Sequence, residues 1–267
     1  MKGFIFDLDG TIYVDDEIIN GVAEAIKGLQ ERGDKVVFLT NKSIASRNDY
    51  VEKLNKLGIK VKLNEVINSN YITAHYLKSE MAEGDSVYVI GEEPLFKELA
   101  EQEIQLADIP EKASFVVLGW DRKFTYDKLN IAFQAWRNGA KIIATNPDRT
   151  CPVQDGEIPD CGAMIGAIEG ATGEPITTIT GKPSLMMAEY VLNNVLGMQA
   201  SDCYMVGDRL ETDIKMAKEA GIQSVLVMTG ITTPEMLRRA DYQPDFVLES
   251  VKDIGTLKVE IPHFRIS

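Results

Sequence analysis

Two aspartates, Asp7 and Asp9, stand one residue apart directly after the apolar run "GFIF", and "GT" follows them. Carboxylates this close repel each other, and burying an ionised carboxylate without a partner is costly. A nearby cation would offset that cost. Such a pair can supply a nucleophile, a general acid and base, or oxygen ligands for a hard cation such as Mg²⁺.

Three further segments carry residues of matching chemistry. They are "LTNKS" with Thr40 and Asn41, "TGKPS" with Lys182, and "VGDRLETD" with Asp208 and Asp213. Taken singly, each has a simple structural explanation as a helix cap, a turn or a solvated lysine. Taken together they occur in one order, at the ends of predicted strands. In a doubly wound sheet, ligands bind beyond the carboxyl ends of the strands.

A shared chemistry explains the four segments. Asp7, Asp208 and a carbonyl near Asp9 offer the hard oxygen ligands that Mg²⁺ prefers, and such an ion often bridges a substrate phosphate. Thr40 and Lys182 would then supply a hydroxyl donor and a cation for phosphoryl oxygens. Backbone N–H groups in the turn after Asp7 could add to that phosphate site.

Strands and helices alternate along the chain, which indicates a parallel sheet with right-handed crossovers. The spacing of apolar residues predicts helices that begin near 22, 46, 72, 95, 125, 184 and 213. Short buried runs predict strands at 4–6, 36–39, 66–67, 87–91, 115–119, 141–145, 203–208, 224–230 and 246–248. The fold class is therefore α/β. Composition alone reveals no domain boundary.

Composition narrows the function classes. The chain has 267 residues, 45% hydrophobic content and a net charge of −13, which disfavours nucleic acid or an anionic membrane surface as a partner. No apolar run approaches the length of a membrane span, and the three cysteines form no CxxC, so we expect a cytoplasmic protein with reduced thiols. The two histidines lie in no metal-ligand spacing, so carboxylates are the expected carriers of any catalysis.

These motifs resemble those of the haloacid dehalogenase (HAD) superfamily of aspartate-nucleophile phosphotransferases. The resemblance rests on D-x-D-G-T at residues 7–11, Thr40 of "LTN", Lys182 of "GKP", and G-D-x-x-x-x-D at residues 207–213. It covers the whole chain. The "TNPD" at 145–148 and the "CGAMIGAIE" run are similar to the NagD-like, p-nitrophenyl phosphatase branch.

The resemblance implies a Rossmannoid parallel-sheet core with an inserted α/β cap domain of type II. Residues 1–80 and 180–267 would form the core, and residues 81–179 the cap. The cap would close over the site, exclude water and read the leaving group. The family's "TNN" is "TNK" here, so Lys42 could contact an anionic substrate or face solvent.

The resemblance also implies a mechanism and its residues. Asp7 would attack phosphorus and form an aspartyl-phosphate, Asp9 would act as general acid and base, and Thr11 would orient Asp9. Mg²⁺ would bind Asp7, the Asp9 carbonyl and Asp208. Thr40, Asn41 and Lys182 would bind the phosphoryl group. Asp213 would hold either the water molecules on the metal or Lys182.

Several alternatives stay open at this point. Asn146 and Asp148 could read the leaving group or simply form an Asn-Pro-Asp turn. The substrate could be a sugar phosphate, a nucleotide or another small phosphate ester such as p-nitrophenyl phosphate. A phosphotransferase or phosphomutase of the same superfamily, or a phospho-receiver signalling module, would use similar residues. By the resemblance, a homodimer through the cap is an alternative to a monomer.

Overall fold

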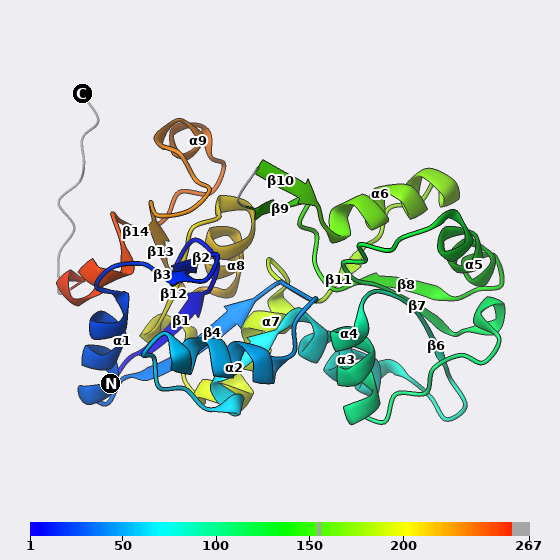
Figure 1. The fold of residues 1–267 in the computed structure, drawn as a ribbon, viewed down its shortest axis with the longest axis horizontal. Coiled ribbons are helices and arrows are strands. Elements are labelled where there is room, and N and C mark those ends of the chain that lie inside the picture. Colours follow the sequence, from blue (N-terminus) through cyan, green and yellow to red (C-terminus); the bar gives the residue numbers. More distant parts are fainter. Residues whose placement is uncertain (154–155, 258–267) are drawn as a thin grey trace. The chain divides into compact units, whose positions relative to one another are not determined.

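The computed structural model describes residues 1–153 and 156–257, which form two compact units (Figure 1). The first unit is built from Met1–Leu39, Lys53–Glu65 and the described residues from Val191 to 257. The second is built from Thr40–Glu52 and Val66–Tyr190. Helix α2 (Arg47–Lys56) begins in the second unit and ends in the first. Each unit is described by itself.

The first unit contains a parallel sheet in the order β14-β13-β12-β1-β4. Every residue of β1 is buried, as is typical of a parallel strand covered on both faces. The registers Phe6↔Val206 and Asp7↔Leu39 bring the carboxyl ends of β1, β12 and β4 to one edge. The strands are β1 (Gly3–Asp7), β4 (Lys35–Thr40), β12 (Cys203–Gly207), β13 (Gln223–Val227) and β14 (Phe246–Leu248).

Helices flank this sheet. In α1 (Val22–Glu31) the residues Val22, Ile26 and Leu29 are buried at helical spacing, and the helix packs against η6 (Val251–Thr256). The other elements are the hairpin β2 (Tyr13–Val14) and β3 (Glu17–Ile18), the helices α8 (Lys215–Ala220) and α9 (Pro234–Arg239), the 3-10 turns η1 (Leu63–Glu65) and η4 (Ala200–Asp202), and the π-helical segments η3 (Val191–Leu196) and η5 (Leu210–Ile214).

The second unit has its own parallel sheet, in the order β11-β8-β7-β6 (Figure 1). One apolar cluster, including Val116 and Leu118, joins it to α5 and α6, and another, including Val89 and Val117, joins it to α3 and α4. The sheet strands are β6 (Val87–Ile90), β7 (Phe115–Leu118), β8 (Lys141–Ala144) and β11 (Thr178–Ile179). The helices are α3 (Ser69–Glu80), α4 (Glu93–Glu101), α5 (Tyr126–Arg137), α6 (Cys161–Thr172) and α7 (Leu185–Tyr190).

Three smaller elements complete the second unit: β5 (Val66–Asn68), the 3-10 turn η2 (Pro110–Lys112), and the antiparallel pair β9 (Thr150–Val153) and β10 (Gly156–Pro159). The predicted α/β class and parallel strands are confirmed. The boundaries predicted for the family's cap, 81–179, stay a prediction. Across the described ranges, every helix is too short or too polar to cross a membrane.

Candidate active site

Asp7 is the last residue of β1, and a tight turn follows it. The amide of Ile12 donates to the Leu8 carbonyl at 2.8 Å, and Gly10 adopts a φ of +77°, which a side chain would strain. The buried Thr11 hydroxyl donates to Asp7 Oδ2 at 3.5 Å. Thr11 therefore contacts the predicted nucleophile, and its predicted role in orienting Asp9 stays a prediction.

Asp208 and Asp213 join Asp7 at the same edge of the sheet. Asp208 follows β12, the parallel neighbour of β1, and Asp213 lies in η5. Carboxylate oxygens of the three residues lie within 4.8 Å of one another, and all three side chains are buried. A side chain at Gly207 would put its Cβ 2.3 Å from Asp213 Oδ2, so glycine allows this approach.

The electrostatics of this carboxylate cluster favour a cation. Burial, together with the charges of Asp7 and Asp213, raises the pKa of Asp208 to about 8. Asp208 Oδ1 is buried and lacks a hydrogen-bond partner among the described residues. Three converging carboxylates with one unsatisfied oxygen are a hard-oxygen donor set that fits Mg²⁺.

The segment Thr229–Thr232 after β13 was not predicted as part of the site. It contacts Asp208 and the turn that follows β1. The Ile231 amide donates to Asp208 Oδ2 at 2.7 Å, and the Thr232 hydroxyl donates to the Asp208 carbonyl. The Thr229 hydroxyl donates to the Gly10 carbonyl at 2.6 Å. A Cβ at Gly230 would lie 2.0 Å from Asp208 Oδ2. In the sequence, the only sign of this segment is the "TG" that follows a buried run. The prediction treated these two residues as the end of the strand at 224–230.

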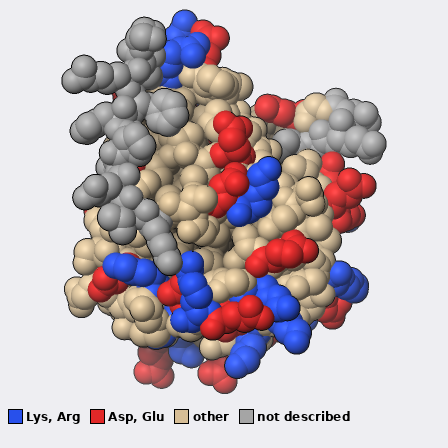
Figure 2. All heavy atoms as spheres, turned by 90° about the vertical axis from the view of Figure 1, so that its left-hand side faces the viewer, with Lys and Arg blue, Asp and Glu red and all other residues tan. Residues whose placement is uncertain are grey.

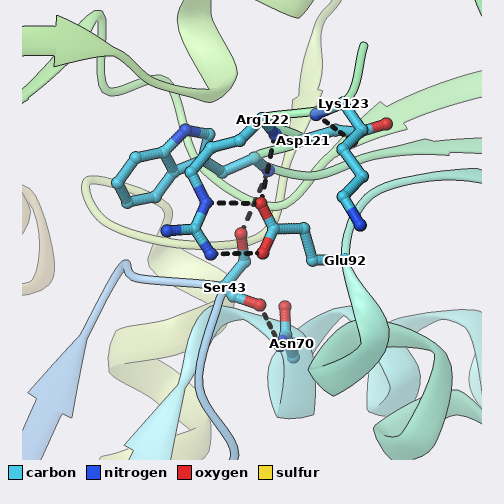
Figure 3. Close-up of polar contacts among 7 residues, drawn as sticks. Ser43, Asn70, Glu92, Asp121, Arg122 and Lys123 are labelled. Carbon is cyan, nitrogen blue, oxygen red and sulfur yellow. Dashed lines mark hydrogen bonds and ion pairs between the residues drawn. The ribbon is translucent and has the colours of Figure 1, made fainter.

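In the second unit, the loop after β4 is held by buried polar side chains. Thr40 Oγ1 accepts from the Lys42 amide at 3.2 Å, and Ser69 donates to the Asn41 carbonyl at 2.7 Å. The Ser43 hydroxyl accepts from the Trp120 amide at 3.0 Å. The Ser43 carbonyl accepts from Asn70 Nδ2 at 2.9 Å (Figure 3). The predicted phosphate-binding loop is therefore anchored by α3 and by the chain that leaves β7.

Lys182 reaches this loop along β11. The β8–β11 pairing continues past the strand, because the Gly181 amide donates to the Thr145 carbonyl at 2.8 Å. The Lys182 amide then donates to Asn41 Oδ1 at 2.8 Å, and Asn41 Nδ2 donates to the Lys182 carbonyl at 3.0 Å. A Cβ at Gly181 would lie 2.4 Å from the Thr145 carbonyl oxygen. The structure thus brings together two predicted phosphate-binding residues, Asn41 and Lys182.

Asn146 and Asp148, the predicted leaving-group contacts, lie beside Asn41. Asn146 is 1% exposed, and its Nδ2 donates to the Asn41 carbonyl at 3.1 Å. Asp148 Oδ2 accepts from Asn41 Nδ2 at 3.1 Å, and the Asp148 amide donates to Asn146 Oδ1 at 3.0 Å. Their reading of the leaving group stays a prediction.

The predicted residues thus fall into two groups, each within one unit. The first unit holds the carboxylate cluster, Asp7, Asp208 and Asp213, with Asp9 and Thr11 in the turn after β1. The second unit holds Thr40, Asn41, Lys182, Asn146 and Asp148. Sequence reasoning missed the residues that anchor them, namely Ser43, Ser69, Asn70 and the 229–232 segment.

Comparison with known proteins settles the family. The family model for haloacid dehalogenase-like hydrolases matches residues 4–105, and a second, HAD-hydrolase-like model matches residues 179–254. The sugar-phosphatase AraL of Bacillus subtilis (strain 168) is 41% identical over 258 residues, which cover 97% of this chain and 93% of that protein. The chain belongs to the haloacid dehalogenase-like hydrolases. An acid sugar phosphatase of Staphylococcus haemolyticus is 34% identical, with 97% and 96% covered.

Solved structures of this HAD family share the fold. The p-nitrophenyl phosphatase of Archaeoglobus fulgidus matches with a TM-score of 0.89 and 36% identity, covering 95% of this chain and 97% of that one. NagD of E. coli K-12 matches with a TM-score of 0.85 and 30% identity, covering 95% and 98%. The predicted family, NagD-like branch and fold class are confirmed.

Proposed function

We propose that this HAD hydrolase is a Mg²⁺-dependent phosphatase of small-molecule phosphate monoesters that works through an aspartyl-phosphate. The observation that carries the proposal is the convergence of the buried carboxylates of Asp7 and Asp208, at the ends of adjacent strands, with that of Asp213 in η5. Relatives named sugar phosphatases and p-nitrophenyl phosphatases support the substrate class. Candidate substrates are sugar phosphates, nucleotides and p-nitrophenyl phosphate.

The reaction would run in two displacement steps. Asp7 attacks phosphorus in line, so that a carboxylate–phosphorus bond forms while the bond to the leaving alcohol breaks, and Asp9 gives that alcohol a proton. Asp9 then takes a proton from water, whose oxygen attacks the same phosphorus. This second step releases inorganic phosphate and restores the Asp7 carboxylate.

Asp7, Asp208 and the Asp9 carbonyl would hold the Mg²⁺, with Asp213 beside them. The bound ion would supply positive charge that offsets the carboxylates and the phosphoryl oxygens. Asp213 Oδ2 accepts from the Arg209 amide at 3.1 Å, which fixes the orientation of its carboxylate. The Ile231 amide fixes the Asp208 carboxylate in the same way, and the Thr232 hydroxyl holds the Asp208 main-chain carbonyl.

Thr40 and Lys182 would bind the transferring phosphoryl group through their side chains. Asn41, whose carboxamide is engaged by Lys182 and Asp148, would take part through its backbone. Their surroundings support this role, because the loop after β4 is anchored through Ser43 and Ser69 before any ligand arrives. Charge in the transition state of phosphoryl transfer spreads over the equatorial oxygens, so a fixed cation and fixed donors contribute much of the rate enhancement.

The decisive experiment is a panel of phosphate esters assayed for released phosphate, with Mg²⁺ and with EDTA. We expect hydrolysis with Mg²⁺, loss of activity in EDTA, and recovery when Mg²⁺ is restored. Full activity in EDTA would contradict the metal assignment. Transfer of the phosphoryl group to a second sugar hydroxyl, seen by product analysis, would instead indicate a phosphomutase. Cytoplasmic location, the absence of nucleic-acid or membrane partners, and a homodimer through the cap stay predictions.

A further inference from the structure

The carboxamide of Asn41 is fully engaged in contacts with the protein. An asparagine side chain offers two N–H donors and one carbonyl oxygen. In Asn41 the two donors go to the Lys182 carbonyl and to Asp148 Oδ2, and the oxygen accepts from the Lys182 amide. The side chain therefore binds both backbone polar groups of Lys182, as a neighbouring strand would.

A second layer of contacts holds Asn41 itself. Asn146 Nδ2 and the Ser69 hydroxyl both donate to the Asn41 carbonyl, at 3.1 and 2.7 Å. Asn146 Oδ1 accepts from the Asp148 amide, so the turn after β8 places the Asp148 carboxylate against Asn41. Asn41, Asn146 and Lys182 are each at most 6% exposed. These contacts form a continuous buried network around Lys182.

The network leaves Asn146 without a donor for a substrate. Its two N–H groups go to the Asn41 carbonyl and to Thr145 Oγ1, at 3.1 and 3.2 Å. A residue that reads a leaving group needs a donor or acceptor that faces that group. Both side-chain N–H groups of Asn146 donate to protein atoms, as those of Asn41 do.

We propose that Asn146 and Asp148, acting through Asn41, are positioning residues that set where Lys182 meets the phosphoryl group, and that Asn146 does not read the leaving group. This inference rests on the proposed function, because it assumes that Lys182 binds a phosphoryl group. It predicts an effect common to all phosphate esters, since every substrate shares the phosphoryl group and only the leaving groups differ.

The test compares Asp148→Ala, Asp148→Asn and a matched control across esters with sugar, nucleoside and nitrophenyl leaving groups. Asp148→Ala removes the acceptor for Asn41 Nδ2, whereas Asp148→Asn keeps a carbonyl oxygen there. The control, Asp85→Ala, removes another turn aspartate of the second unit, one that accepts from the Ala82 amide and the Ser114 hydroxyl. The readouts are kcat and KM for each ester, the melting temperature, and the Kd of orthovanadate by calorimetry.

We expect Asp148→Ala to lower kcat/KM by about 10- to 100-fold, by the same factor for every ester, and to weaken orthovanadate binding in parallel. Asp148→Asn should stay within about 3-fold of the wild type, and Asp85→Ala should leave kcat/KM unchanged. A loss that depends on the leaving group would overturn the inference, as would an Asp148→Asn enzyme as impaired as Asp148→Ala.

A reference variant separates this inference from the proposed function. Lys182→Ala should abolish orthovanadate binding if Lys182 holds the phosphoryl group. Unchanged binding in Lys182→Ala would refute the phosphate-binding assignment itself. If Lys182→Ala loses orthovanadate binding but Asp148→Ala keeps the wild-type Kd and kcat/KM, only the positioning role would be refuted.

Discussion

At the level of single residues, the proposed chemistry depends most on the carboxylate of Asp7. Asp7→Asn keeps the size of the side chain and an oxygen that can accept from Thr11, but it replaces an anionic nucleophile by a neutral amide. We expect phosphate release to fall by about a thousandfold or more, because covalent catalysis is lost. The melting temperature should not fall, because the change removes a negative charge from beside Asp208 and Asp213.

The measurement is a phosphate-release assay paired with thermal denaturation of the same preparations. Hydrolysis retained near the wild-type rate would rule out Asp7 as the nucleophile. A lower melting temperature would mean that lost stability contributes to the lost activity, and the carboxylate would then have to be tested through trapping of the phosphoenzyme.

Gly230 is the second residue on which the carboxylate cluster depends. In Gly230→Ala the new Cβ would meet Asp208 Oδ2, so the carboxylate or the segment after β13 must move. We expect Mg²⁺ affinity, measured by calorimetry, to fall about tenfold, with a stability loss of about 1–3 kcal/mol from overpacking. The control is Gly28→Ala within α1, where a Cβ meets nothing within 4 Å.

Gly28→Ala should keep wild-type Mg²⁺ affinity and gain up to about 1 kcal/mol in unfolding free energy, because alanine favours a helix. Equal Mg²⁺ affinity in Gly230→Ala and the wild type would show that Asp208 does not hold the ion as proposed.

At the level of elements, the sequence predicted the strands of both parallel sheets except β11, but it missed the short strands β2, β3, β9 and β10 and the helices α6 and α9. Buried runs such as "FIF" and "KVVFLT" are unambiguous, and parallel pairing of β1 with β12 necessarily brings the carboxyl ends that bear Asp7 and Asp208 together. That is why the carboxylate cluster could be foreseen. Asn146 and Asp148 could be named, but their contacts with Asn41 depend on how the β8–β11 pairing ends, which the sequence pattern does not encode.

Two helical regions illustrate what the sequence pattern misses. Helix α6 has glycine at every fourth position from Gly162 to Gly170, which lowers its helix propensity, yet it forms because Asp160 caps it and Met164 and Ile168 pack into the core. The single helix predicted from 184 is instead α7, ending at Tyr190, followed by the π-helical Val191–Leu196. For α6, packing into the core, which periodicity cannot show, offsets the low helix propensity of its glycines.

The start of α3 allows a test at this scale. Asn68 Oδ1 caps the helix by accepting from the Tyr71 amide at 3.0 Å, and Asn68 Nδ2 donates to the Ala45 carbonyl at 3.2 Å. Asn68→Ala removes both contacts from a buried site, so we expect the unfolding free energy to fall by about 2 kcal/mol. The exposed cap of α5, in Thr125→Ala, should cost about 1 kcal/mol.

Chemical denaturation of the two variants measures the difference. The loss in Asn68→Ala should exceed the loss in Thr125→Ala, because only Asn68 also anchors the loop that carries Thr40 and Ser43. Equal losses would mean that the bond to Ala45 contributes nothing to stability.

At the level of the whole molecule, the net charge of the chain does not decide the charge of the small substrate that its site can bind. The chain carries a net charge of −13, and on the face in Figure 2 acidic and basic side chains are interspersed. A polyanion needs a broad basic surface, whereas a single phosphoryl group needs only local donors such as the buried Lys182. The sequence could therefore disfavour nucleic acid while favouring a small anionic substrate, without contradiction.

The stability of the whole fold should also depend on pH through Glu98. This buried carboxyl in α4 pairs with Arg47 at 3.4 Å, and the Arg47 guanidinium lies 3.8 Å from the centre of the Tyr71 ring. Burial raises the pKa of Glu98 above its ordinary value of 4.5, although the Arg47 charge opposes the shift. The folded state therefore binds the Glu98 proton more tightly than the unfolded state does.

The sign of the pH effect follows. The stabilisation from this proton is fully present below pH 4.5 and is lost as the pH rises through the higher pKa of the folded state. Glu98→Gln is neutral at every pH and keeps an oxygen that can accept from Arg47. Its unfolding free energy relative to the wild type should therefore increase as the pH rises from about 4 to about 8. Urea denaturation of both proteins across this range measures that difference, and a difference that stays constant or decreases with pH would contradict the raised pKa.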